Sequence, residues 1–173
     1  TYEEFHRANV LSQEHLIRAA ERTNCPRFVF ISSPTLYYPK GDMRDRIGIK
    51  ESEPLPKKFV NHFAATKRLA EIRLEESNLD YITLRPRALL GRGDTVIMPR
   101  LIRAYEEGRL KIIGTGKNRV DLTPVSNVVD AILYALTANE EALGKVYNIS
   151  NGEPIAMWPA VSNILQALGY EPP

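Results

Sequence analysis

The chain has 173 residues, of which 43% are hydrophobic and 25% charged, with a formal net charge of +2. At roughly 150 residues per domain, this supports one domain with a real core and excludes a disordered chain. The charges are scattered, which indicates neither a nucleic-acid partner nor a membrane-surface partner. No apolar run approaches the ~20 residues of a membrane span and no signal peptide is visible, so we expect a cytoplasmic protein. The single cysteine, Cys25, excludes an internal disulfide, and the three histidines lack metal-ligand spacing, so we predict no metal site.

The expected elements alternate between helices and strands. In the first half, apolar spacing predicts a helix over 2–23, a strand over 28–31, a Pro-rich loop over 34–56, a helix over 57–77 and a strand over 81–84. In the second half it predicts a helix over 95–107, a strand over 110–113, an extended stretch over 120–125, a helix over 127–137, a strand over 146–149 and a helix over 155–168. Such alternation favours an α/β fold with a parallel sheet.

The phosphate-binding glycine motif of dinucleotide-binding folds is absent from these 173 residues. That motif needs glycines because only they let the backbone approach a pyrophosphate at a helix N-terminus. Gly114-Thr115-Gly116 is followed by Arg119 where the third glycine would stand, which favours a turn. Gly91-Arg92-Gly93-Asp94 fits a loop and a helix cap better than a phosphate site.

One group of residues points to chemistry. The strand over 28–31 ends in Ser32-Ser33, and the next helix carries Phe63 and Lys67 one turn apart on one face. That helix would hold both side chains toward the end of the strand. In the alternative interpretation, Lys67 extends to solvent and Phe63 is an ordinary core residue, and the residues alone leave both interpretations open.

The order of these segments resembles the extended short-chain dehydrogenase/reductase superfamily, the NAD-dependent epimerase/dehydratases, and within it the 3β-hydroxysteroid-dehydrogenase-like branch. The resemblance is carried by Asn9-Val10, Arg27-Phe28-Val29, Ser32-Ser33, Phe63 to Lys67, Leu84-Arg85-Pro86 with Gly91, Val120-Asp121-Leu122, Asn127-Val128 and Val146-Tyr147-Asn148-Ile149. It implies the second half of a doubly wound, Rossmann-type parallel sheet plus part of a small C-terminal substrate-binding region. Residues 1–93 would be the C-terminal half of the NAD(P)-binding domain, and residues 94–173 would complete the sheet and form part of the substrate-binding region.

The resemblance also implies residue roles. Ser33 would orient the substrate oxygen, and Lys67 would bind the nicotinamide ribose. Asn9 would complete the catalytic tetrad, whose acid/base tyrosine position is occupied by Phe63. The cofactor, NAD or NADP, would contact Lys67, Ser32, Arg85 and Pro86, and a small-molecule substrate would contact Thr35, Arg87, Ala88 and Arg119.

Two departures from the family pattern weaken the expected activity. Phenylalanine has no ionisable oxygen, and general acid–base catalysis is typically worth about 10²- to 10⁴-fold, so we expect an impaired enzyme. Tyr37 or Tyr38 would be the substitute proton donors, although neither stands four residues before a lysine. The second departure is the missing glycine-rich segment, which precedes this part of the chain in relatives. We therefore expect a fragment that is inactive or weak alone and that exposes a parallel-strand edge.

The leading hypothesis is thus a fragment of an NAD(P)-dependent oxidoreductase or epimerase/dehydratase acting on a carbinol or carbonyl group. Nucleotide-sugar epimerases fit less well, because Ala88 stands at the place of a sugar-contacting asparagine and Val120 at that of a diphosphate-binding arginine. The rival hypothesis is a non-catalytic, truncated relative that binds a ligand or partner. In either case, the resemblance implies a homodimer through the helices over 2–23 and 57–77.

Overall fold

The computed structural model describes residues 1–41, 46–112 and 115–171, which form two compact units. The first unit comprises Thr1–Arg87 and Val128–Ile149, and the second comprises Ala88–Asn127 and Ser150–Pro173. Residues 128–149 join the first unit because their strand extends its sheet. The functional division expected at residue 93 stays a prediction.

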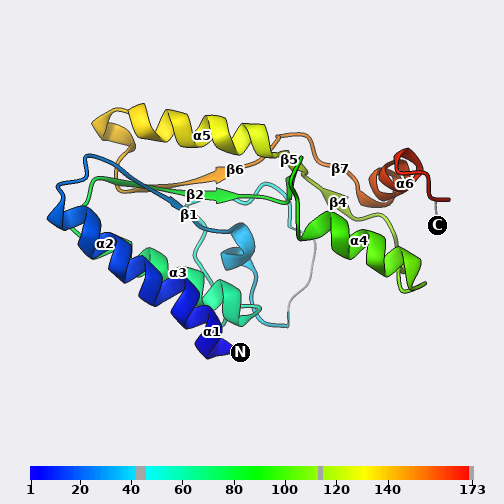
Figure 1. Cartoon of the computed structure of the whole chain (residues 1–173), viewed down its shortest axis with the longest axis horizontal. Coiled ribbons are helices and arrows are strands. Elements are labelled where there is room, and N and C mark those ends of the chain that lie inside the picture. The colour runs from blue at the N-terminus through cyan, green and yellow to red at the C-terminus, as the bar shows by residue number, and fades with distance from the viewer. Residues whose placement is uncertain (42–45, 113–114, 172–173) are drawn as a thin grey trace. The chain divides into compact units, whose positions relative to one another are not determined.

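The first unit is built on a parallel sheet of three strands (Figure 1). They are β1 (Phe28–Ile31), β2 (Tyr81–Pro86) and β6 (Lys145–Ile149), in the order β1-β2-β6. The predicted parallel sheet is confirmed. Strand β2 runs two residues past the predicted end and includes Pro86, which pairs with Ile149. A proline is tolerated at this last position because it removes only one N–H donor from the ladder.

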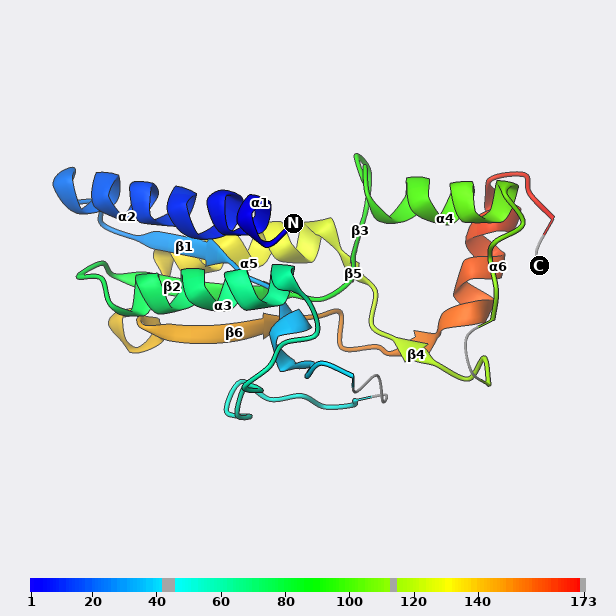
Figure 2. The same ribbon diagram turned by 90° about the horizontal axis from the view of Figure 1, so that it is seen from below.

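Helices cover both faces of this sheet (Figures 1 and 2). On one face, α2 (Ser12–Arg22) and α3 (His62–Glu75) pack on β1 through Ile17, Phe30, Ala70 and Leu74. On the other face, α5 (Val125–Thr137) packs on β2 through Ile82, Leu84 and Ala135. The two sets alternate along the strands, as the pleat of a sheet buried on both faces requires.

The helix predicted over 2–23 is continuous but not uniform. It comprises α1 (Tyr2–His6), a π-helical turn η1 (Arg7–Leu11) and α2. A capping box formed by Thr1 and Glu4 begins it. The π turn contains Asn9, and such turns inside α-helices are frequent at functional sites.

The helix predicted over 57–77 begins later than expected. Residues before Asn61 pair with the loop instead, since Lys40 N donates to Lys58 O and Val60 N to Tyr38 O. Asn61 then caps α3 by accepting a hydrogen bond from Ala64 N at 2.9 Å. The long loop also contains the 3-10 helix η2 (Pro34–Tyr37), and a second 3-10 turn, η3 (Glu140–Ala142), precedes β6.

The second unit contains two small sheets and two helices. Strands β3 (Leu89–Leu90) and β5 (Thr123–Pro124) are parallel, and β4 (Arg119–Val120) and β7 (Ile155–Ala156) are antiparallel. The helices are α4 (Ile97–Glu106) and α6 (Met157–Ala167).

The second-unit predictions need four corrections. Residues 155–156 form β7 rather than the start of the last helix, and the stretch over 120–125 is divided between β4, irregular residues 121–122, β5 and the first residue of α5. Strand β3 was not predicted. The strand predicted over 110–113 is wrong for 110–112, which are irregular, while residue 113 lies outside the described residues. Two-residue strands form only through a tertiary partner and are too short to show a periodicity.

Candidate active site

Two hydroxyl groups lie together where β1 ends. Ser33 caps η2, and its Oγ accepts a hydrogen bond from Thr35 N at 3.2 Å. The same Oγ shares a hydrogen bond with Thr35 Oγ1 at 2.9 Å. Pro34 at the start of η2 suits this turn because its φ angle is already helical. The turn therefore presents Ser33 and Thr35 at the carboxyl edge of the sheet, where open α/β sheets bind ligands.

Lys67 reaches this edge from α3. Its Nζ donates to the carbonyl oxygen of Ile31 at 2.9 Å and lies 4.8 Å from the centre of the Phe30 ring. Burial lowers the pKa of Lys67, and the nearby Glu71 carboxylate partly offsets that effect. The lysine thus points to the end of β1 rather than into solvent, while the role of Phe63 stays open.

Phe63 lies one turn before Lys67 and brings no ionisable group. Its half-buried ring packs edge-on against Phe5, with the ring centres 6.1 Å apart.

Asn9 ties the first helix to the helix that carries Phe63 and Lys67. Its Nδ2 donates to Thr66 Oγ1 at 2.9 Å. Thr66 is fully buried, and its hydroxyl donates to the carbonyl of His62 or Phe63. Asn9 is thus connected through the Thr66 hydroxyl to the backbone of the first turn of α3, which carries Phe63.

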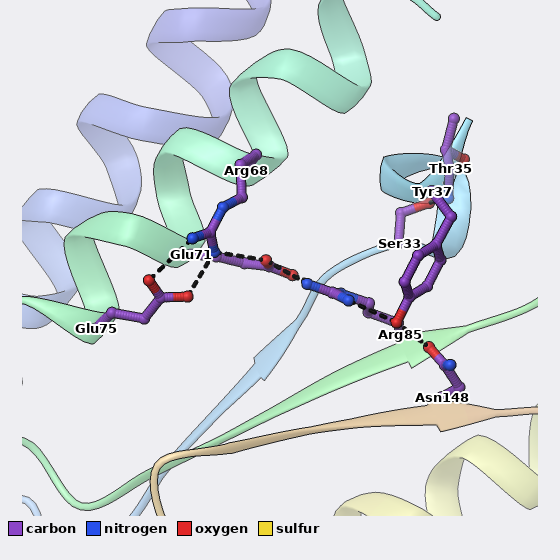
Figure 3. Close-up of polar contacts among 8 residues, drawn as sticks. All are labelled: Ser33, Thr35, Tyr37, Arg68, Glu71, Glu75, Arg85 and Asn148. Atoms are coloured by element: carbon purple, nitrogen blue, oxygen red, sulfur yellow. Dashed lines mark hydrogen bonds and ion pairs between the residues drawn. The ribbon is translucent and has the colours of Figure 1, made fainter. Parts of the chain in front are cut away.

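Arg85 is buried in a network of charged and polar side chains (Figure 3). Its Nε and Nη2 donate to the two carboxylate oxygens of Glu71 at 2.9 and 2.7 Å. Its Nη1 donates to the hydroxyl of Tyr37 at 2.7 Å, and that hydroxyl donates to Asn148 Oδ1 at 3.1 Å. All three nitrogens of the Arg85 guanidinium thus donate hydrogen bonds within the protein. The predicted contact between Arg85 and the cofactor is therefore left to the backbone of this residue and stays a prediction.

The other expected cofactor contacts also lie at the ends of strands. Ser32 is 5% exposed and its backbone N donates to Leu84 O at 2.7 Å. Its Oγ is buried and has no hydrogen-bond partner among the residues of the structure. Pro86 is buried at the end of β2. An orphaned hydroxyl beside the residue that binds Lys67 is a polar group available to a ligand.

The four expected substrate contacts are divided between the units. Thr35 and Arg87 belong to the first unit, where the Arg87 guanidinium lies 5.9 Å from the centre of the Tyr38 ring. Ala88 and Arg119 belong to the second unit. There Ala88 has a positive φ of 37° and accepts a hydrogen bond from Thr123 N, and Arg119 donates to Pro154 O.

The network gives two residues roles that the sequence did not indicate. Tyr37, considered a substitute proton donor, is 1% exposed and its hydroxyl both accepts and donates a hydrogen bond within the protein. Glu71, one turn after Lys67, was not predicted at all. The sequence feature that could have revealed Glu71 is a carboxylate on the same, otherwise apolar, face of the helix. A buried acidic residue is almost always paired, so such a residue predicts a cationic partner. Within the described ranges, no cluster of three or more His, Cys, Asp or Glu side chains could hold a metal.

Residues 1–150 match the NAD dependent epimerase/dehydratase family. The chain belongs to this family. It is 34% identical to a 2-alkyl-3-oxoalkanoate reductase of Stenotrophomonas maltophilia (strain K279a), covering 98% of this chain and 53% of that protein. It is 31% identical to the human sterol-4-alpha-carboxylate 3-dehydrogenase, decarboxylating, covering 98% of this chain and 47% of that protein. The chain spans about half the length of the curated relatives it matches.

Solved structures agree on the fold. MoeE5 in complex with UDP-glucuronic acid and NAD superimposes with a TM-score of 0.71 at 26% identity, over 95% of this chain and 55% of that one. The dTDP-glucose 4,6-dehydratase DesIV of Streptomyces venezuelae, with NAD and TYD bound, superimposes with a TM-score of 0.79 at 20% identity, over 99% and 53%. The Rossmann-type α/β class is confirmed, and NAD complexes among these neighbours support NAD or NADP as the cofactor by family resemblance. None of the helices in the described part of the chain is long and apolar enough to cross a membrane.

Proposed function

We propose that this chain is part of an NAD(P)-dependent oxidoreductase of the 3β-hydroxysteroid-dehydrogenase-like branch that acts on a carbinol or carbonyl carbon. The observation that carries the proposal is Lys67, whose Nζ is bound to the last residue of β1 next to the Ser33–Thr35 turn. A reductase and a 3-dehydrogenase among the relatives support the same class of reaction.

The residues at this edge fit the nicotinamide end of the cofactor. Lys67 offers a cationic donor for the ribose hydroxyls, and the buried Oγ of Ser32 offers an unsatisfied polar group. NAD or NADP, when bound, exchanges a hydride with the substrate carbon. The chain's own contribution is to hold the ribose through Lys67 and to orient the substrate oxygen through the hydroxyl of Ser33. Thr35 and Arg87 are the proposed substrate contacts within the first unit.

Proton transfer is the step that this chain lacks. At position 63 an aromatic ring without a hydroxyl packs on Phe5, so no group there can exchange a proton with the substrate oxygen. Tyr37 is a poor substitute because Arg85 and Asn148 occupy its hydroxyl. We therefore propose a catalytically impaired member of the family that functions in the cytoplasm.

The test restores the missing phenol. In the full-length protein, Phe63→Tyr places a hydroxyl one turn from the positive charge of Lys67, which favours the phenolate. Dehydrogenase or epimerase turnover should rise by about 10²-fold or more, the usual worth of a placed proton-transfer group. Adding Lys67→Ala should abolish the gain. Brisk turnover by the unmodified protein, unchanged by Phe63→Tyr, would show that the proton travels by another residue, with Tyr38 the first candidate.

The second candidate function is a non-catalytic scaffold that binds a ligand or partner. It is favoured by Phe63, which brings no proton-transfer group to the acid/base position. The same experiment separates the two candidates, because a scaffold should gain no turnover from Phe63→Tyr.

A further inference from the structure

The Ser33–Thr35 turn is held at its far end by a buried side-chain network. Leu36 and Tyr37, the last residues of η2, are 0% and 1% exposed. The Tyr37 hydroxyl joins Arg85 on β2 to Asn148 on β6, as Figure 3 shows. The proposed function uses Ser33 but assigns nothing to this network.

The network begins on the helix that carries Lys67. Glu71 stands one turn after Lys67 on α3 and is 1% exposed. Lys67 is bound to the end of β1 and Glu71 to Arg85 on β2, so two successive turns of α3 are attached to two neighbouring strands. A bidentate, buried pair of this kind sets geometry strongly, because both partners lose their hydration and neither can move alone.

Asn148 extends the network to the long loop. Its Nδ2 donates to Ile49 O at 3.2 Å, and its backbone N donates to Glu51 Oε1 at 2.7 Å. On the same segment, the Arg46 guanidinium donates to Tyr37 O at 2.5 Å and pairs with Glu53. The segment 46–53 is therefore attached to Asn148 and to the backbone oxygen of Tyr37.

We propose that Tyr37 is a positioning residue, whose hydroxyl holds the Ser33–Thr35 turn and the segment 46–53 in place against the buried Glu71–Arg85 pair of the Lys67 helix. Without that hydroxyl, Arg85 Nη1 and Asn148 Oδ1 lose their shared partner and the turn is free to shift relative to Lys67. The effect of Tyr37 on catalysis rests on the proposed function. Its effect on the position of the turn does not.

The test compares Tyr37→Phe with Tyr134→Phe by residue-resolved amide hydrogen exchange of this chain. Tyr134→Phe makes the same chemical change at a side chain that is 75% exposed. In Tyr37→Phe, exchange should become about tenfold faster at Thr35 N, Tyr38 N and the amides of 46–53, since they lose a local constraint. Exchange in α2 should change little, and Tyr134→Phe should change none of these amides.

Equal acceleration in every element would indicate a global loss of stability and would overturn the proposal, as would unchanged exchange at Thr35 and 46–53. If Tyr37→Phe does not fold, Asn148→Ala removes the other partner of the hydroxyl at a half-buried site. Faster exchange is then expected at Thr35 N and Tyr38 N, which are the readout because Asn148 itself binds Ile49. In the full-length Phe63→Tyr protein, Tyr37→Phe should lower kcat about tenfold with the KM for the cofactor unchanged. If the Phe63→Tyr protein shows no turnover, the proposed function is contradicted. The role of Tyr37 in holding the turn is still tested by hydrogen exchange, which does not depend on activity.

Discussion

Lys67 holds a charge in a half-buried site, and this links its protonation to stability. Burial lowers the pKa of Lys67 in the folded protein below its ordinary value of 10.5. Between the lowered pKa and 10.5 the unfolded chain binds more protons than the folded one, so this lysine's contribution to stability rises with pH in that window. At pH values below the pKa of Lys67 in the folded protein, the lysine is charged in both states and its burial destabilises the folded protein by the full desolvation cost.

The expected result is a pH-dependent difference between two proteins. Denaturant unfolding of the wild type and of Lys67→Met, measured from neutral pH towards pH 10.5, should show the wild type gaining stability relative to the variant as pH rises. Lys57→Met, at an exposed lysine, is the matched control. A difference between wild type and Lys67→Met that is flat or falls with pH would contradict the buried placement of the ammonium group.

The Glu71–Arg85 pair makes a second prediction at the scale of single residues. Glu71→Ala leaves the buried Arg85 guanidinium uncompensated, and breaking a buried pair in this way typically costs about 3–5 kcal/mol. Glu75→Ala is the control, because Glu75 pairs with Arg68 on the same helix but is 40% exposed, and an exposed pair is worth only about 0–1 kcal/mol. Urea unfolding measures both, and equal losses would contradict the burial of the pair.

At the scale of elements, the first helix and α3 are both packed on one face of the sheet, and the first helix keeps apolar side chains at the surface. On the first helix, Leu11 is 39% exposed and Leu16 is 56% exposed. A two-fold symmetric dimer needs only one self-complementary patch, and the exposed leucines of the first helix, beside α3, are the candidate for it. We therefore predict a homodimer through residues 2–22 and 62–75.

Leu16→Glu should shift such a dimer to monomer, because it places a charge in the contact. Leu133→Glu is matched to it, since Leu133 lies on α5, on the opposite face of the sheet, and is also 56% exposed. Light scattering over a range of concentrations measures the mass of each protein. A wild-type monomer at high concentration, or equal effects of the two variants, would show that these apolar faces serve another purpose.

At the scale of the whole molecule, the cofactor-binding groups are unevenly distributed. In the proposed function Lys67 and Ser32 serve the nicotinamide end, whereas the 173 residues contain no glycine-rich strand-turn-helix motif for a pyrophosphate. Within the described part of the chain, β2 is the only strand that pairs with β1. Calorimetric titration of this chain with NAD and NADP should therefore detect only very weak binding. A dissociation constant of a few micromolar or tighter would show that these residues hold the whole cofactor.

The sequence by itself determined the α/β class and the parallel sheet. Apolar periodicity identifies the face of a helix or strand that is buried, whereas the contact of Lys67 with Ile31 was decided only by the structure. The family resemblance added the cofactor class and the position of Phe63, because those depend on matching residues in order along the chain.

Only the tertiary structure decided which polar groups meet. Arg85 and Tyr37 are 48 residues apart in sequence, and Tyr37 and Asn148 are 111 apart, so no local pattern relates them. Their contacts follow from the order β1-β2-β6, which places the carboxyl ends of three distant strands at one edge. The same reason explains the late start of α3, since Val60 pairs with Tyr38 across the loop. Hydrogen bonds form between groups that lie close together in the folded chain. Periodicity along the sequence does not show which groups these are.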